Sequence, residues 1–328
     1  MKEIGGYIEL DTYTGQMLHD DGIKLNCGRN ALAYLIKAKN IKKINMPKFM
    51  CDSNDKVLSE NGVEVVYYTI GLDFKPKIKD YDGWLYVVNF YGQLSNVYIK
   101  SLGKNIIVDN AQAYFEEPIP GIDTLYTCRK FFGVPDGAIL YTDKFIEINE
   151  RDESYKRMNF LLGRFEKSAS PFYQEYVDNN HLFQNETIKA MSKLTENLLH
   201  GIDYQAVKKI RTQNFSYLNI KLASINKLKL NITNGAFMYP LYLENGFELR
   251  KQLQELKIYI PTLWPAVFNI CSENELEYDM AKNILPIPVD QRYTIQDMEY
   301  IVNMIMYYSN LEREENKVYE KSINVRNC

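Results

Sequence analysis

The stretch Ile106-Ile107-Val108-Asp109-Asn110-Ala111-Gln112 decides how this chain folds, because an apolar run ends there in a carboxylate. A near-continuous apolar run is typical of a strand covered on both faces, as in a parallel sheet. Strands of this kind are predicted at Asn105–Asp109, Lys43–Met46, Val63–Tyr68, Trp84–Phe90 and Ala138–Tyr141. The sequence therefore predicts an α/β fold whose mostly parallel sheet is flanked by helices.

Helices are predicted between these strands. An apolar stripe at helical spacing predicts a helix over residues 29–39, formed by Ala31, Tyr34, Leu35 and Ala38. Asp52–Asn61 supplies a second crossover helix, and Glu147–His200 is long, charged and helical in pattern, with no clear strand.

The pattern changes again after His200. A long helix is predicted at Tyr204–Leu228, and short strands at Phe237–Leu243, Ile258–Pro261 and Ile284–Ile287. Thr294 and Asp297 resemble a capping box that opens a last amphipathic helix, and the tail Glu312–Cys328 is polar. We therefore divide the chain into a large α/β domain with an N-terminal arm, residues 1–203, and a small α+β domain, residues 204–328.

Composition excludes several classes of function. The 328 residues are 46% hydrophobic and 25% charged, as in soluble globular proteins. A net charge of −3 leaves no basic field for nucleic acid, and no apolar run is long enough to span a membrane, so a cytoplasmic protein is expected. The 5 cysteines form no CxxC pair and the 3 histidines are isolated, so neither disulfides nor a metal site is expected.

Three features could carry chemistry, and each has a plainer explanation. Gly28 lies at the mouth of a helix, where free backbone N–H groups can hold a phosphate, although an ordinary helix start looks the same. Asp109 ends a strand, where α/β sheets bind ligands, although it could simply cap a loop. Lys130 lies in an irregular loop beside Phe131 and Phe132, which would lower its pKa and free a nucleophilic amine, although a surface lysine is the alternative.

The order and spacing of the three features resemble those of fold-type I pyridoxal 5'-phosphate (PLP) enzymes, since Lys130 follows the Asp-x-x-Gln of residues 109–112 by 21 residues. Within that group the chain resembles the DegT-type sugar aminotransferase family. Met46-Pro47-Lys48-Phe49, Phe90-Tyr91-Gly92-Gln93 and Ile284-Leu285-Pro286-Ile287-Pro288 are similar to further family segments.

The resemblance implies a role for each matched residue. Lys130 would bind PLP covalently and later shuttle a proton, Asp109 would pair with the pyridine nitrogen, and Gln112 would reach the phenolic oxygen. The backbone of Gly28, Arg29 and Asn30 would hold the phosphate together with the Thr127 hydroxyl, and the Arg29 side chain could add charge-assisted bonds.

Two departures from the family stand out. The position of its ring-stacking aromatic is occupied by Cys51, so that Phe49 or Tyr91 takes the role or the stack is missing. The Gly-Tyr-Asn-x-Arg stretch of sugar aminotransferases is absent, and residues 185–192 stand at the comparable place.

The resemblance implies a homodimeric transaminase that moves an amino group from a donor such as glutamate to a keto sugar. A nucleotide-linked sugar is expected, in surface-polysaccharide or deoxyaminosugar synthesis. Its diphosphate would need cations, for which the candidates are Lys189 and Lys193 on one helix face and Arg211 across a dimer interface. The alternatives are another PLP reaction, by a decarboxylase or an aldol-type lyase, and a non-catalytic regulator with the same fold.

Overall fold

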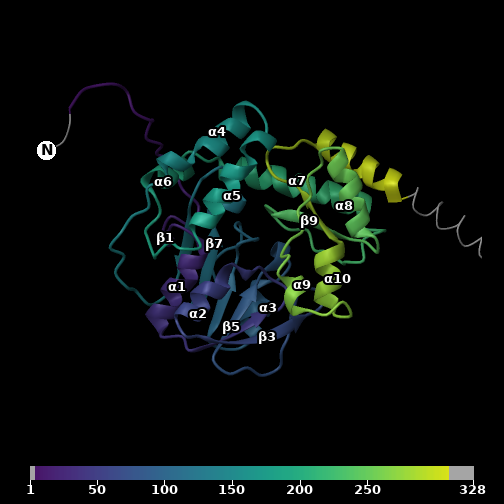
Figure 1. Cartoon of the computed structure of the whole chain (residues 1–328), viewed down its shortest axis with the longest axis horizontal. Coiled ribbons are helices and arrows are strands. Elements are labelled where there is room, and N and C mark those ends of the chain that lie inside the picture. The colour runs from purple at the N-terminus through teal and green to yellow at the C-terminus, as the bar shows by residue number, and fades with distance from the viewer. Residues whose placement is uncertain (1–3, 310–328) are drawn as a thin grey trace, which may run out of the picture.

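The computed structural model describes residues 4–309, which form a central sheet with helices around it (Figure 1). The sheet has eight strands in the order β1-β8-β7-β6-β5-β2-β3-β4. Neighbours from β3 to β7 run parallel, whereas β1, β4 and β8 pair antiparallel at the two sides. The strands are β1 (Ile23–Leu25), β2 (Lys43–Pro47), β3 (Glu64–Ile70), β4 (Pro76–Lys77), β5 (Trp84–Val88), β6 (Ile106–Asp109), β7 (Asp123–Thr127) and β8 (Ala138–Tyr141).

The five strands expected in this half of the chain are all present. The sequence did not reveal β1, β4 and β7, and β7 is the informative omission. Its residues Asp-Thr-Leu-Tyr-Thr are too polar to look like a central strand, yet all but Thr127 are buried. Asp123 is tolerated there because Lys39 Nζ lies 2.8 Å from its carboxylate, a pairing between segments far apart in the chain.

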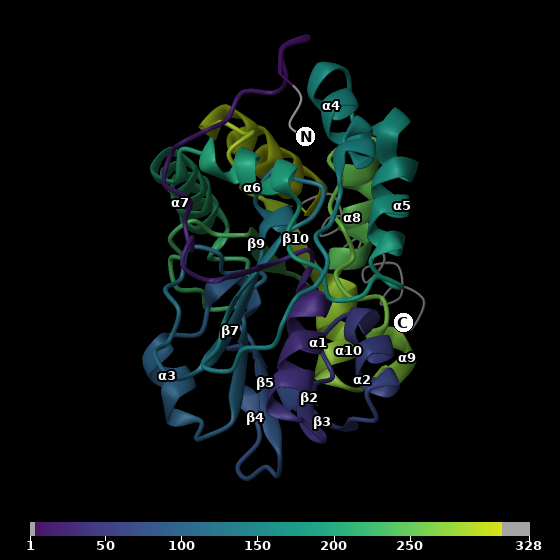
Figure 2. The same ribbon diagram turned by 90° about the vertical axis from the view of Figure 1, so that its left-hand side faces the viewer.

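Helices cover both faces of the sheet. Helix α1 (Gly28–Lys39) packs against β1, β7 and β8, and α2 (Asp55–Glu60) against β3. Figure 2 shows both on one side of the sheet and α3 (Asn96–Ser101) on the other. Residues 147–200, whose pattern predicted helices, form α4 (Asn159–Glu166), α5 (Tyr173–Leu182) and α6 (Lys193–His200).

The C-terminal part is built on a two-stranded sheet, in which β9 (Met238–Tyr242) pairs antiparallel with β10 (Ile284–Pro288). Around it lie α7 (Tyr204–Leu222), α8 (Gly246–Glu255), α9 (Val267–Ile270), α10 (Leu276–Asn283) and a last helix over 295–309. A second apolar core belongs to this part, with buried side chains such as Phe215, Leu241, Leu253 and Leu285.

Two expectations for this part are wrong, whereas the strands expected at Phe237–Leu243 and Ile284–Ile287 and the capping box are confirmed. Helix α7 ends at Leu222 instead of Leu228, because Asn226 turns to donate to Pro240 O and accept from Tyr242 N on β9. Residues 258–261 form no strand. They follow α8 after Lys257, whose left-handed φ of 62° changes the direction of the chain. The capping box is present, since Thr294 N donates to Asp297 at 2.7 Å and Asp297 N donates back to Thr294 Oγ1.

The expected polar tail, Glu312–Cys328, lies outside the described residues. Among residues 4–309, no helix combines the length and the apolar character that crossing a membrane requires.

Candidate active site

The carboxyl ends of β5, β6 and β7 lie next to one another, because these three strands are parallel neighbours. Val88, which ends β5, is in register with Asp109, which ends β6. Lys130 ends a short 3₁₀ turn, η3 (Cys128–Lys130), that follows β7 directly. The fold thus brings together the carboxylate and the lysine that the sequence singled out.

Asp109 has a fixed carboxylate. Its Oδ1 accepts from Ala111 N at 2.8 Å and its Oδ2 from the Tyr86 hydroxyl at 2.9 Å. Burial raises the pKa of Asp109, and the positive charge of Lys130 opposes that shift. A buried carboxylate held in this way favours a further cation in front of it.

Gln112 is buried and oriented by the segment after β5. Its Oε1 accepts from Tyr91 N at 2.8 Å. This bond requires the backbone to turn sharply at Tyr91 and Gly92, whose φ angles are 54° and 70°. Because the amide oxygen is taken, the amide N–H groups are the part of Gln112 that can reach a ligand oxygen.

The N-terminus of α1 lies against the end of β7. A Cβ on Gly28 would be 2.8 Å from Thr127 Cγ2, so a side chain there would collide with Thr127. Cys27 precedes the helix in an extended conformation and its side chain does not cap it, nor is there an acidic residue in the first turn. The helix therefore directs uncapped N–H groups and its positive dipole end beside the Thr127 side chain.

Two buried polar atoms at this helix end, Thr127 Oγ1 and Arg29 Nε, have no hydrogen-bond partner in the part of the chain that the structure describes. Arg29 Nη1 donates to the Asn180 carbonyl at 3.3 Å, and the Arg129 guanidinium donates to the side chain of the same asparagine. Burial lowers the pKa of Arg129, and the nearby charge of Arg29 lowers it further. Within residues 4–309 neither arginine forms an ion pair, so this place has unmatched positive charge.

Asn30 has a structural side chain. Its Nδ2 donates to Asn26 Oδ1 at 2.9 Å and to Thr187 O at 2.6 Å, which ties α1 to the loop before α6. Its backbone N–H is the part of Asn30 that can donate to an anion, which is the role that the resemblance implied.

Lys130 is exposed, and its surroundings differ from the expected ones. Its Nζ lies 5.7 Å from the ring centroid of Phe237. Phe131 and Phe132 instead point into the core, where both rings pack on Tyr114. The expectation that these two rings desolvate the amine is therefore wrong, because consecutive side chains after η3 turn away from the cleft.

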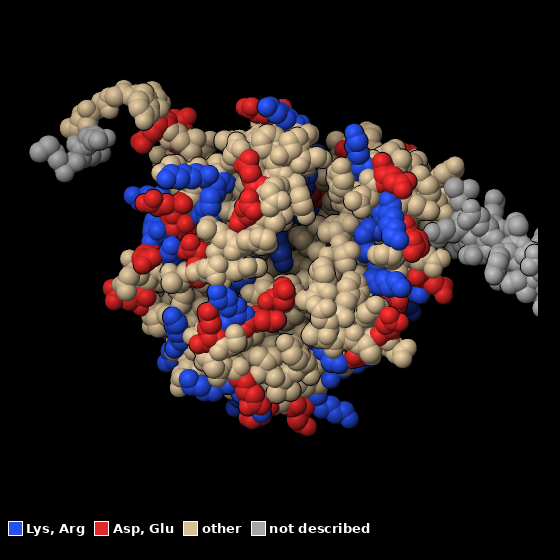
Figure 3. All heavy atoms as spheres, in the orientation of Figure 1, with Lys and Arg blue, Asp and Glu red and all other residues tan. Residues whose placement is uncertain are grey.

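Asp109, Gln112 and Lys130 line one cleft of about 280 Å³, together with Met50, Cys51, Val88, Phe90, Ala111 and Trp264. The face seen in Figure 3 is hollowed near its centre, with basic side chains in the hollow and both signs of charge scattered around it. Neither Phe49 nor Tyr91 lines the cleft; both are buried behind it, against Trp264.

Sequence reasoning missed Phe90 and Trp264 as cleft residues. Trp264 is one of only 2 tryptophans in the chain, which is a compositional signal, but nothing in the sequence places it opposite strands that lie over 150 residues earlier.

The three cations expected to bind a substrate differ in position. Lys193 is exposed at the start of α6, but Lys189 precedes that helix and pairs with Glu186 at 2.6 Å, so the two do not share a helix face. Arg211 is buried, and its guanidinium donates to Phe131 O, Ala236 O and Gln291. Burial lowers the pKa of Arg211 to about 10. Its place inside its own chain does not fit a cation that crosses a dimer interface.

Among the comparisons with known proteins, the one with solved structures supports the observed architecture. No protein-family model and no curated protein sequence matches the chain. Solved structures do: a DegT DnrJ EryC1 StrS aminotransferase from Brucella abortus is 15% identical, with a TM-score of 0.58 over 87% of this chain and 85% of that one. The sugar aminotransferase CalS13 from Micromonospora echinospora is 12% identical, with a TM-score of 0.58 over 86% of each chain.

NtdA from Bacillus subtilis, solved with the bound cofactor PMP, is 12% identical, with a TM-score of 0.61 over 87% of this chain and 72% of that one. These likenesses confirm the expected fold-type I architecture. Of these neighbours, CalS13 is a sugar aminotransferase and the Brucella protein is a DegT DnrJ EryC1 StrS aminotransferase, the family that the sequence motifs resemble.

Proposed function

We propose that the chain is a PLP-dependent aminotransferase that transfers an amino group from an amino acid such as glutamate to a keto sugar. One observation carries the proposal: a cleft with Asp109 and Lys130 in its walls lies at the same strand ends as a helix N-terminus with unmatched polar groups. A lysine amine, a partner for the ring nitrogen such as a carboxylate, and an anion site for the phosphate are the groups with which proteins bind PLP.

The residues present fit PLP. Thr127 Oγ1 and Arg29 Nε are buried without partners, and leaving such groups unpaired costs free energy that a phosphate would recover. Gly28 leaves the space beside Thr127 that a side chain would fill. Asp109 faces the cleft with a pKa raised by burial, so a protonated ring nitrogen would stabilise its charged form.

Each residue would then have a defined task. Bound PLP supplies an electron sink that stabilises negative charge on a substrate carbon. The Asp109 carboxylate, fixed by Tyr86 and Ala111, holds the proton on the ring nitrogen. At ~4 Å and an effective dielectric of ~20 this attraction is about 4 kcal/mol, or roughly three pK units. Lys130 Nζ, which lines the same cleft, would accept and return the proton of the substrate carbon.

For the acceptor we propose a nucleotide-linked keto sugar, made for surface-polysaccharide or deoxyaminosugar synthesis in the cytoplasm. Lys193 stays a candidate for its diphosphate because it is exposed, whereas Lys189 is already paired and Arg211 is buried. A homodimer is part of this proposal, since the family assembles its sites between two subunits.

The test is a half-reaction followed by an acceptor panel. Protein loaded with PLP is mixed with glutamate, and the absorption of the cofactor should change from the pyridoxal to the pyridoxamine form. Keto sugars with and without a nucleotide should then restore the first spectrum, with preference for the nucleotide-linked ones. Release of CO₂ or an aldehyde from amino acids would instead indicate a decarboxylase or a lyase, and an unchanged spectrum with every donor a regulator.

A further inference from the structure

Trp264 has a backbone conformation that bulky residues rarely adopt. It lies in the loop before α9, is 8% exposed, and has a φ of 64°. Its carbonyl accepts from Val267 N at 3.0 Å, so the first turn of α9 holds this conformation in place. A strained aromatic residue that its surroundings hold in position is a reason to ask what its side chain does.

The indole is locked between rings from the N-terminal half. Its centroid lies 4.7 Å from that of Phe49 and 5.4 Å from that of Phe90, at interplanar angles of 72° and 73°. Such edge-to-face contacts fix the orientation of a ring. Trp264 therefore has a set position over the ends of β2 and β5, although it comes from a distant part of the chain.

The lining of the cleft comes from segments far apart in the chain. Val88, Phe90, Asp109, Ala111 and Gln112 belong to the ends of β5 and β6 and the residues directly after them, whereas Trp264 comes from the C-terminal part. Phe90 and Trp264 are the aromatic side chains among the lining residues. Trp264 is the more exposed of the two, at 8% against 1%, so it offers more of its ring to a molecule in the cleft.

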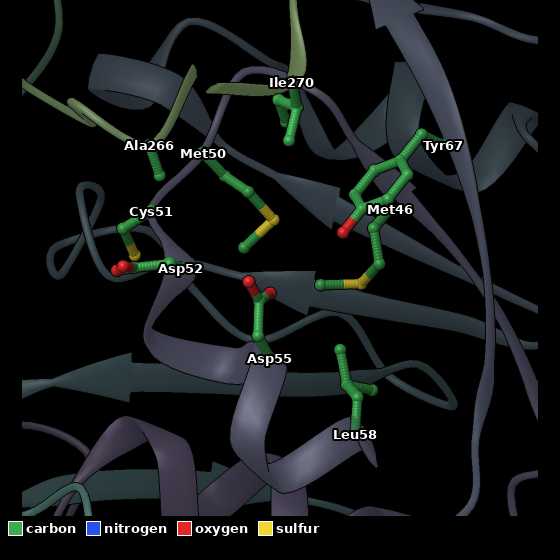
Figure 4. Close-up of a pocket in the computed structure, with 9 residues that line it drawn as sticks. All are labelled: Met46, Met50, Cys51, Asp52, Asp55, Leu58, Tyr67, Ala266 and Ile270. Atoms are coloured by element: carbon green, nitrogen blue, oxygen red, sulfur yellow. The ribbon is translucent and has the colours of Figure 1, made fainter. Parts of the chain in front are cut away.

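The loop that carries Trp264 also closes a neighbouring cleft of about 330 Å³, which shares Met50 and Cys51 with the first. In Figure 4, Ala266 and Ile270 lie on the far side of Met50 and Cys51 from Asp55. The segment from Trp264 to the end of α9 at Ile270 thus contributes to both of these clefts, each of which is also lined by Cys51.

We propose that Trp264 supplies the aromatic wall for the PLP ring, in place of the aromatic that the chain lacks at Cys51. This inference rests on the proposed function and adds a positioning residue to it. An indole in the wall of the cleft gives a flat ring an aromatic surface to pack against.

Fluorine NMR of the full chain labelled with 5-fluorotryptophan tests the inference, because the protein gives only 2 signals, from Trp84 and Trp264. Trp84 begins β5, at the opposite end from Val88, and serves as the internal control. Trp84→Phe and Trp264→Phe assign the signals. Adding PMP, and separately PLP, to cofactor-free protein should move the Trp264 signal and leave the Trp84 signal in place.

Cofactor affinity provides the second readout. Trp264→Leu should weaken PLP binding roughly three- to tenfold, whereas Trp264→Phe and Trp84→Phe should bind nearly as the unaltered protein does. A stationary Trp264 signal at saturating cofactor, or an unweakened Trp264→Leu, overturns the inference and leaves the proposed function standing. If the unaltered protein binds neither PMP nor PLP, the proposed function fails and this inference fails with it.

Discussion

Asp109 and Asp136, two carboxylates whose pKa is raised by burial, have opposite surroundings. Asp136 accepts from Ser192 N at 2.8 Å, from Ser192 Oγ at 2.7 Å and from Thr195 Oγ1, so its oxygens are all used within the chain. Asp109 accepts two bonds and also faces an open cleft with Lys130 in its wall. Burial raises the pKa of both. Burial and a shifted pKa therefore do not distinguish a functional carboxylate from a structural one; the open side of Asp109 does.

The largest effect is expected from replacing Lys130, whose amine lines the same cleft as Asp109. Lys130→Ala should lower turnover by at least ~10²–10⁴-fold, because the group that moves the substrate proton is lost. The melting temperature should stay unchanged, since Lys130 is exposed. Borohydride reduction followed by peptide mapping should place the cofactor on Lys130 in the unaltered protein.

Lys144→Ala is the matched control, because Lys144 is also exposed and follows β8. It should keep both turnover and labelling. A label on Lys144 would contradict the assignment.

Asp109→Asn should come next, with turnover per folded molecule reduced by roughly 10³-fold, the equivalent of about 4 kcal/mol of lost attraction to the ring nitrogen. Bound PLP should persist in part, because the phosphate site is separate. Single-turnover kinetics on protein of verified melting temperature measures this. A loop cap would behave in the opposite way, with about 0.5–2 kcal/mol less stability and an almost unchanged rate.

Asp136→Asn should affect stability instead of chemistry. The new amide NH₂ would replace one of the two acceptor oxygens, so either Ser192 N or the hydroxyls of Ser192 and Thr195 would lose their acceptor, and the free energy of unfolding should fall by about 1–3 kcal/mol. Turnover per folded molecule should change little. Urea unfolding beside an active-site titration measures both quantities, and a large loss of rate at full stability would erase the contrast between the two carboxylates.

The smallest expected effect is a pH dependence of the stability of the cofactor-free protein. Burial raises the pKa of Asp109, so the folded chain binds more protons than the unfolded chain above ~3.9, the ordinary value for Asp. The contribution of this group to stability is therefore present at low pH and is lost as pH rises through the raised pKa. The stability of Asp109→Asn relative to the unaltered protein should accordingly increase with pH.

Unfolding at several pH values measures this difference with and without PLP. Bound PLP should flatten the trend, because a cation then faces Asp109. A difference that is independent of pH in the cofactor-free protein would show that burial does not disfavour the charged carboxylate.

Sequence reasoning succeeded where a local pattern carried the information. The apolar run that ends at Asp109, the glycine that begins α1 and the Thr294–Asp297 capping box all depend on neighbours within a few residues. It failed at β7, whose polar residues are stabilised by Lys39, and at residues 258–261, whose apolar pattern resembles that of a strand. Strand β7 depends on Lys39, a partner distant in sequence. Residues 258–261 stay irregular because no strand among the described residues pairs with them.

The sequence by itself determined the α/β architecture and singled out Asp109, Lys130 and Gly28 as candidates for the chemistry, because short stretches of sequence specify strand ends and helix starts. Only the tertiary structure decided that Arg211 is an internal hydrogen-bond donor, that Phe49 and Tyr91 lie behind the cleft, and that Trp264 lies in its wall. The physical reason is that a side chain's role depends on which groups fill its remaining contacts, and those groups come from elements that only folding brings together.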